Sequence, residues 1–316
     1  MVNRLWDPGL RELRLGFTKP NAEAWAELAT LTKLEWLDLH NSEITSEDLA
    51  CLAGLTELRY LDLDGTAVAD DGMQHLCHLQ KLLLLYLGDT KITDAGIRAL
   101  LPLKALKVLS LSGEELTDTG VGYVAEMRSL ELLGIDSPHI TDQGLRSLGL
   151  LTNLKELRVG GSFSDEGLQG LSGLQSLTRL NLGCPRLKGA DLTAIGRLNS
   201  LEELAIGGAE FRAGGLAALQ GLPALHSLIL SGEVFRGDTL PHLKGLGSLR
   251  CLTVWGDSLT DDVLPHLEGW PALTLLSVSG SVISEAGVRA LARSLQDCNV
   301  MSDYGTFGPG GRDPAD

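Results

Sequence analysis

The sequence predicts an α/β solenoid of about twelve repeats, and three observations lead to this fold class. The pattern Leu-x-x-Leu-x-Leu, with Ile or Val at its last position in some copies, returns along the whole 316-residue chain. Hydrophobic residues make up 44% of the chain and aromatic residues only 4%, so the apolar content is aliphatic. Within each copy the apolar spacing changes from the period of a strand to that of a helix. Such units bury their apolar faces only when they are stacked on one another.

The repeat has a period of 24 residues, with one step of 23 between the seventh and eighth copies. The copies begin at Leu10, Leu34, Leu58, Leu82, Leu106, Leu130, Leu154, Leu177, Leu201, Leu225, Leu249 and Leu273. A period that changes by only one residue over so many copies is far more regular than chance would give. A repeat array, in which each unit contacts its neighbours, is therefore predicted in place of two globular domains.

The copy that begins at Leu82 shows the elements of the unit in order. Leu85 and Leu87 are two residues apart, which is the period of a strand. Ile97, Leu100 and Leu103 are three apart, which places them on one face of a helix. The sequence therefore predicts a strand, a turn and a short helix in each copy.

The segment before each predicted helix carries helix-start residues. Thr93-Asp94-Ala95-Gly96 recurs as Thr117-Asp118-Thr119-Gly120, Thr141-Asp142-Gln143-Gly144, Ser164-Asp165-Glu166-Gly167 and Ser284-Glu285-Ala286-Gly287. A Thr or Ser side chain at this position accepts a hydrogen bond from a free amide of the first turn, and removing one should cost about 1 kcal/mol. The acidic residue beside it is expected to stabilise the positive end of the helix by about 0.3–1 kcal/mol.

The complete unit, LxxLxLxxTxITDxGLxxLxxL, resembles a leucine-rich repeat. It is similar to the T-D-x-G-L subclass, the cysteine-containing or ribonuclease-inhibitor-like repeats found in F-box proteins and bacterial cytoplasmic repeat proteins. The resemblance covers about residues 10 to 298. It implies a horseshoe with a parallel sheet on the concave side and helices on the convex side. One fold hosts many binding roles, so it implies binding without naming a partner.

Departures from the repeat divide the chain into three predicted segments. Residues 1–33 form an N-terminal capping repeat, in which Asn21 replaces the usual Thr as the helix cap. Residues 34–300 form the leucine-rich repeat array. Residues 301–316 are rich in Gly, Pro and Asp and are predicted to be a flexible C-terminal tail.

The concave face carries the candidate partner-binding residues. Strand alternation turns positions 3 and 5 of each copy, flanked by 2 and 7, toward that face, and neighbouring strands lie about 4.8 Å apart. The side chains predicted to form one patch are Trp36, Tyr60, Leu84 and Tyr86, bordered by Asp38, His40, Asp62 and Asp64, with Trp255 as a lone second anchor. Exposed aromatic residues rimmed by charge are typical of interface hot spots. The alternative is that these rings only shield the sheet or contact the N-terminal segment.

Two further clusters have a purely structural interpretation beside a functional one. The basic residues Lys188, Arg212 and Arg236 replace the capping Thr in three adjacent copies and form a candidate anion-binding ladder. Pairing with Glu210, Glu233 and Asp238 is the favoured interpretation, because surface ion pairs are common and weak. Asp238/His242 and Asp262/His266 resemble metal-ligand pairs, but ordinary contacts on a helix surface explain them better. We therefore predict no metal and no cofactor.

Composition narrows the classes of partner and the compartment. The net charge is −15, and an acidic surface repels phosphates, so no nucleic-acid partner is predicted. The five Cys residues are scattered and odd in number, which favours a reducing compartment. Residues 1–8 lack a signal core, and no apolar stretch is long enough to span a membrane. The sequence predicts a cytoplasmic protein with no membrane partner, and it leaves the oligomeric state open.

These observations predict a non-catalytic scaffold that binds a protein, preferably one with a basic surface, on its concave face. The sequence contains no G-x-S-x-G motif, phosphate loop or CxxC motif. One alternative is a substrate-recognition subunit of a ubiquitin-ligase-type complex, although residues 1–9 are too few for an F-box and an adaptor would be needed. The sequence also leaves open a metal-dependent enzyme and a ribonuclease-inhibitor-like role.

Overall fold

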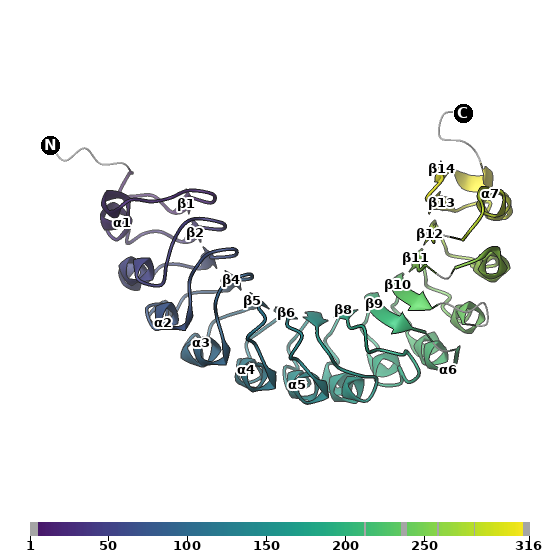
Figure 1. The fold of residues 1–316 in the computed structure, drawn as a ribbon, viewed down its shortest axis with the longest axis horizontal. Helices are drawn as coiled ribbons and strands as arrows, with labels where there is room; N and C mark the ends of the chain where they lie inside the picture. Colours follow the sequence, from purple (N-terminus) through teal and green to yellow (C-terminus); the bar gives the residue numbers. More distant parts are fainter. Residues whose placement is uncertain (1–5, 212, 235–238, 258, 281, 312–316) are drawn as a thin grey trace. The chain divides into compact units, whose positions relative to one another are not determined.

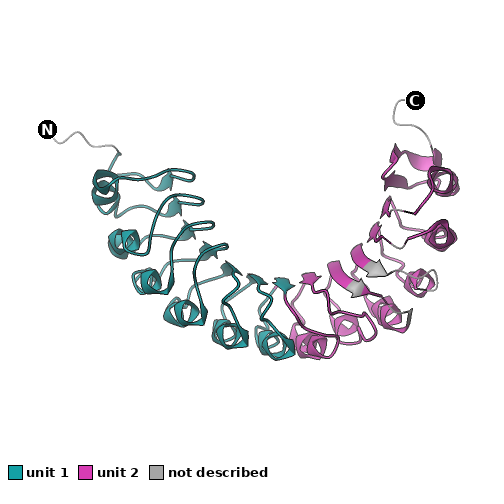
Figure 2. Cartoon of the chain, viewed as in Figure 1, with its two compact units in different colours: residues 1–154, 158–160 teal, residues 155–157, 161–316 magenta. Residues whose placement is uncertain are grey.

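The computed structural model describes residues 6–211, 213–234, 239–257, 259–280 and 282–311. The chain divides into two compact units (Figure 2). Unit 1 comprises residues 1–154 and 158–160, and unit 2 comprises residues 155–157 and 161–316. Both units repeat a strand followed by a short helix, and within each unit the helices lie on one side of the sheet (Figure 1).

The strands of unit 1 pair in parallel in chain order. They are β1 (Glu12–Arg14), β2 (Trp36–Asp38), β3 (Tyr60–Asp62), β4 (Leu84–Leu87), β5 (Val108–Ser112) and β6 (Leu132–Asp136). The helices between them are α1 (Ala22–Leu28), η1 (Asp48–Gly54), α2 (Asp70–Met73), α3 (Asp94–Ala99), α4 (Asp118–Val124) and α5 (Asp142–Leu148). Strand β7 (Glu156–Gly160) has residues assigned to both units.

Unit 2 continues the same alternation. Its strands are β8 (Arg179–Gly183), β9 (Glu203–Glu210), β10 (Ser227–Val234), β11 (Cys251–Trp255), β12 (Leu275–Ser279), β13 (Asn299–Ser302) and β14 (Gly305–Phe307). Its helices are η2 (Gly167–Gly173), η3 (Ile195–Arg197), α6 (Ala213–Leu216), η4 (Ala217–Gly221), η5 (Leu240–Leu243), η6 (Asp261–Leu267), α7 (Glu285–Ser294) and η7 (Pro309–Gly311). Strands β8 to β13 pair in parallel, and β14 pairs with β13 in the antiparallel sense.

The predicted repeat positions form the core. The exposed fraction is 0% for Leu82, Leu85 and Leu87 of the fourth copy, and it is 0% for Ile97 in the following helix. Strand register follows the repeat, since Leu85 pairs with Leu109, one period later. The predicted α/β solenoid with a parallel sheet is confirmed.

An aspartate ladder, which the repeat pattern alone did not predict, joins consecutive copies at the helix starts. The Asp94 carboxylate accepts hydrogen bonds from the amide and the hydroxyl of Thr117, at 2.9 and 2.6 Å. The same pair of bonds joins Asp70 to Thr93, Asp118 to Thr141 and Asp261 to Ser284. The acidic residue therefore binds the next repeat, in addition to lying near the positive end of its own helix.

The glycine of the T-D-x-G segment leaves room for this ladder. A Cβ atom on Gly120 would lie 2.3 Å from an oxygen of Asp94, and one on Gly144 would lie 2.4 Å from an oxygen of Asp118. The amide of Gly144 also donates to Asp118 at 3.0 Å. The glycine is thus required by close approach between copies.

The predicted helix caps are confirmed at four hydroxyl side chains and one amide side chain, whereas the N-cap of η2 is Glu166 in place of the predicted Ser164 and makes no side-chain cap hydrogen bond. Thr93, Thr117 and Thr141 each accept from an amide in the first turn of their helix, and Ser284 does so from Gly287. Asn21 caps α1 by accepting from Ala24 at 2.9 Å. The first copy therefore begins its helix with Asn21, as predicted.

Two predictions about the elements need correction. Several copies form a 3₁₀ helix, as in η2, where three glycines weaken an α-helix, and in η5 and η6, where Pro241 and Pro265 lack an amide donor. The flexible tail predicted from Met301 is wrong through Gly311. In that stretch β14 pairs with β13, and Phe307 is only 3% exposed, because the last repeat needs a cover for its apolar edge.

Candidate functional site

The open face of the sheet, which we define as the face opposite the helices, carries alternate strand residues. On unit 1 the register places Trp36 beside Tyr60 and Tyr60 beside Leu84. Two residues further along the same strands, Asp62 lies beside Tyr86. The structure thus brings together the residues that the strand alternation grouped. We call this set the aromatic–acidic patch: Trp36, Tyr60, Leu84, Tyr86, Asp38, His40, Asp62 and Asp64.

The rings of the patch contact one another across strands β2, β3 and β4. The Trp36 and Tyr60 rings are stacked, with centroids 3.4 Å apart and planes 5° apart. Tyr86 continues the row, with its ring centroid 5.5 Å from that of Tyr60 and tilted by 45°. Trp36 is 36% exposed, and Tyr60 and Tyr86 are half-buried. These contacts hold the rings in a fixed row, which lowers the entropy cost of binding against them.

Hydrogen bonds fix the carboxylates around the rings. The Tyr60 hydroxyl donates to Asp62 at 3.0 Å, and the Gly88 amide donates to Asp64 at 2.5 Å. The His40 ring nitrogen Nδ1 lies 2.5 Å from an Asp38 oxygen. The patch therefore presents three oriented acidic groups on two neighbouring strands and the loops that follow them.

The electrostatics of the patch follow from this crowding of acids. The hydrogen bond with Asp38 raises the pKa of His40 above its usual value, and the charges of Asp62 and Asp64 raise it further. Burial raises the pKa of the Asp64 carboxyl, and the neighbouring charge of Asp62 adds to this rise. Burial also raises the pKa of the Tyr86 phenol. A cation placed at the patch would relieve this repulsion between like charges.

Phe17 is a rim residue that sequence reasoning missed. It is 76% exposed and adopts a left-handed backbone conformation, with φ of 58°. Its ring meets the His40 ring edge to face, with centroids 4.7 Å apart. The left-handed conformation belongs to the turn of the repeat, because Asn41, Gly65 and Asp89 also have positive φ. The sequence signal that could have identified Phe17 is its repeat position in the turn after the strand, which it shares with Asn41 and Asp89.

The remaining predicted residues lie on unit 2 or outside the described structure. Trp255 ends strand β11 and is 52% exposed. The backbone amide of Lys188 donates to Asp165 at 3.1 Å, so this residue joins the ladder through its main chain while its side chain is exposed. Arg212 and Arg236 lie outside the described residues, so the basic ladder stays a prediction.

One group in the described part of the chain has the spacing of metal ligands. Asp38, His40 and Asp62 offer atoms that all lie within 4.8 Å of one another. The hydrogen bond between His40 and Asp38 accounts for part of this spacing. The group belongs to the open face of unit 1, whereas the pairs considered from the sequence, with His242 and His266, are on helices. Within the described residues, no helix is long and apolar enough to cross a membrane.

Comparisons with known proteins agree with the fold. Two family models, both described as leucine-rich repeat, match residues 8–68 and 78–101. No curated protein sequence matches the chain. The repeat geometry and these matches show that the chain has a leucine-rich repeat fold.

Solved structures with the same fold include an internalin from Listeria monocytogenes. It is 21% identical, with a TM-score of 0.65, and the match covers 93% of this chain and 86% of the internalin chain. A chain from a TLR13–ssRNA13 complex is 18% identical, with a TM-score of 0.50 and coverage of 92% of this chain and 50% of its own. A leucine-rich repeat protein from Leptospira interrogans is 19% identical, with a TM-score of 0.49 and coverage of 93% and 90%. At these identities the likeness concerns the fold alone.

Proposed function

We propose that this protein is a non-catalytic binding module that holds a protein partner on the open face of its sheet, the face predicted to be concave. The observation that carries the proposal is the aromatic–acidic patch. Its three contacting rings lie in one row and are bordered by oriented carboxylates. Aromatic anchors surrounded by polar groups are typical of binding hot spots.

The charge of the patch selects the kind of partner. Asp38, Asp62 and Asp64 outnumber the one basic group, His40, and the whole chain has a net charge of −15. A protein with a basic surface is therefore the complementary partner, and the acidic field should speed its approach. The same charge opposes binding of RNA, the molecule present in the complex with TLR13.

Affinity capture from native lysate followed by mass spectrometry tests the proposal. The test variant combines Trp36→Ala, Tyr60→Ala and Tyr86→Ala. The matched control combines Val108→Ala, Ser110→Ala and Leu132→Ala, which lie in the same columns of the open face on β5 and β6. We expect basic proteins captured by the wild type and the control to be lost with the test variant. Equal capture by a folded test variant would reject the proposal.

The finer assignments are also proposals. We propose that the repeats belong to the T-D-x-G-L subclass, the cysteine-containing or ribonuclease-inhibitor-like repeats. The aspartate ladder, which the acids of these segments form, supports this assignment. We propose a cytoplasmic location on the strength of the five unpaired Cys residues.

A further inference from the structure

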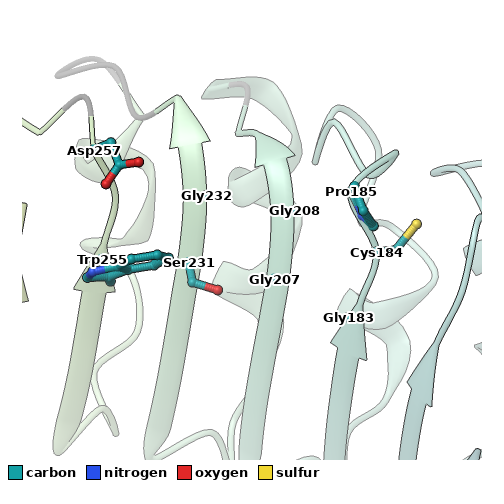
Figure 3. A pocket seen from close by; sticks show the side chains of 9 residues that line it. All are labelled: Gly183, Cys184, Pro185, Gly207, Gly208, Ser231, Gly232, Trp255 and Asp257. Atoms are coloured by element: carbon teal, nitrogen blue, oxygen red, sulfur yellow. The ribbon is translucent and has the colours of Figure 1, made fainter. Parts of the chain in front are cut away.

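A hollow on the open face of unit 2 is lined by none of the residues of the aromatic–acidic patch. It lies over strands β9 and β10 and the ends of β8 and β11, and its volume is about 370 Å³ (Figure 3). Trp255 and Asp257 line it on the β11 side, Ser231 and Gly232 line it on β10, and Gly207 and Gly208 line it on β9 (Figure 3). Small-ligand sites have volumes from about 300 Å³ upward, so the hollow has room for a side chain with its adjoining peptide groups.

The hollow exists because one column of the sheet has glycine on β8 and β9 and only a serine on β10. Strand pairing places Gly183 beside Gly207, Gly207 beside Ser231, and Ser231 beside Trp255. The Trp255 indole extends from β11 toward Ser231 on β10 (Figure 3). The ring therefore lies beside the small Ser231 side chain, and beyond Ser231 the column is bare backbone at Gly207 and Gly183, about 4.8 Å further on with each strand.

The Trp255 indole makes no ring contact and no hydrogen bond with the part of the chain that the structure describes. It is 52% exposed, whereas Trp270 is 7% exposed. Ile229, on the same face of β10, is 43% exposed and extends the apolar surface beside the hollow. An unpartnered indole beside a hollow is an anchor point for a ligand or partner.

The chemistry of the lining selects a planar cation. An indole face attracts a cation, and Asp257, two residues after Trp255, places a carboxylate at the rim. A guanidinium group is planar, stacks on an aromatic ring and pairs with a carboxylate, whereas an ammonium is a compact point charge. The indole face and the carboxylate at the rim therefore favour the planar group.

We propose that this hollow is a socket for an arginine side chain of a protein partner. The proposal goes beyond the aromatic–acidic patch, because it concerns a second surface with its own chemistry. It takes from the proposed function only that the partner is a protein with basic residues.

A filling variant and a matched control distinguish the socket from general effects on the sheet. Gly207→Val would place side-chain atoms in the hollow, and its Cβ would lie 3.2 Å from the Ser231 hydroxyl oxygen, which can rotate away. Gly134→Val adds the same side chain to the open face of unit 1, where the nearest atom to its Cβ is the Ser110 hydroxyl oxygen at 3.7 Å. Asp257→Asn removes the negative charge at the rim and keeps a side chain of the same shape.

The readout is the indole N–H signal of Trp255 in a ¹⁵N NMR spectrum. The chain has five Trp residues, and loss of one signal in Trp255→Phe assigns it. The full-length protein is titrated with acetylated Gly-Arg-Gly amide and with the same peptide carrying citrulline, which is planar but neutral. We expect the Arg peptide to shift the Trp255 signal, and the citrulline peptide to leave it in place. Asp257→Asn should weaken the shift several-fold, and Gly207→Val should abolish it while Gly134→Val preserves it.

Three outcomes would overturn the socket. These are no Trp255 shift with the Arg peptide, an equal shift with the citrulline peptide, or an unchanged shift in a folded Gly207→Val variant. The Trp36/Tyr60/Tyr86 variant should keep the Trp255 shift. Failure of the socket therefore leaves the proposed function standing, and failure of the patch leaves the socket standing.

Discussion

At the scale of single residues, the acid of the T-D-x-G segment has a second role. Sequence reasoning assigned it to the positive end of its own helix, a contribution of about 0.3–1 kcal/mol. The structure shows that the same carboxylate also holds the amide and hydroxyl of the next copy, as Asp70 does with Thr93. That contact joins residues 23 positions apart, so a pattern read within one copy does not reveal it.

Asp70 and Asp71 allow the two roles, stabilising the start of the helix and binding the next copy, to be tested separately. Asp70 and Asp71 both lie in the first turn of α2, but only Asp70 belongs to the ladder, and Asp71 is exposed. We expect Asp70→Ala to lower the free energy of unfolding by about 2 kcal/mol, since two charge-assisted hydrogen bonds are lost. Asp71→Ala should cost about 0.5 kcal/mol or less. Urea unfolding measures both, and equal effects would contradict the ladder.

Two glycines of helix α4 provide an independent test. A Cβ on Gly120 would meet Asp94 at 2.3 Å, whereas a Cβ on Gly122 has no atom within 4 Å. Gly120→Ala should destabilise the protein by about 1–3 kcal/mol, because the side chain overpacks the ladder. Gly122→Ala should stabilise it by about 0.5–1 kcal/mol through helix propensity. Thermal unfolding of the two variants should give shifts of opposite sign; shifts of the same sign would show that Gly120 is not required for space.

At the scale of elements, the sequence predicted the strands better than the helices. The Leu spacing placed a strand in every copy, since only side chains at fixed alternate positions reach the core. Helix type depended on local residues, with α3, α4 and α5 following a complete T-D-x-G segment and η5 containing Pro241. The closing hairpin of β13 and β14 was missed because its composition, rich in Gly and Pro, is also typical of unstructured tails.

The hairpin is expected to act as the C-terminal cap of unit 2. Phe307 is 3% exposed, and the Arg289 guanidinium lies 5.0 Å from its ring centroid. Phe307→Ala should cost about 3 kcal/mol in the last repeats, because it leaves a cavity at the end of the core. Tyr304→Phe, which removes one hydrogen bond to Ile283, should cost about 1 kcal/mol.

Hydrogen exchange locates this effect along the chain. Repeats contact mainly their neighbours, so Phe307→Ala should speed exchange in β12 and β13 and leave β2 to β4 unchanged. Faster exchange throughout unit 1, or an unchanged exchange rate in β12 and β13, would contradict a local cap.

At the scale of the whole molecule, charge and sheet face together define the binding proposal. The chain has 41 acidic and 26 basic residues, and part of the acid excess is held in the ladder between copies. The acids of the aromatic–acidic patch are different, because they border exposed rings. Strand alternation was sufficient to group Trp36, Tyr60 and Tyr86 from the sequence. It did not predict the stacking of the rings, the contact of Phe17 with His40, or the hollow beside Trp255, which depend on side-chain packing across strands.

The dissociation constant of the captured basic partner tests the central claim most directly. It should be measured for the wild type, the Trp36/Tyr60/Tyr86 alanine variant and the Val108/Ser110/Leu132 alanine control. Loss of one hot-spot residue costs about 2 kcal/mol, so we predict at least about 30-fold weaker binding for the aromatic variant and unchanged binding for the control. A folded aromatic variant that binds as tightly as the wild type would contradict the account.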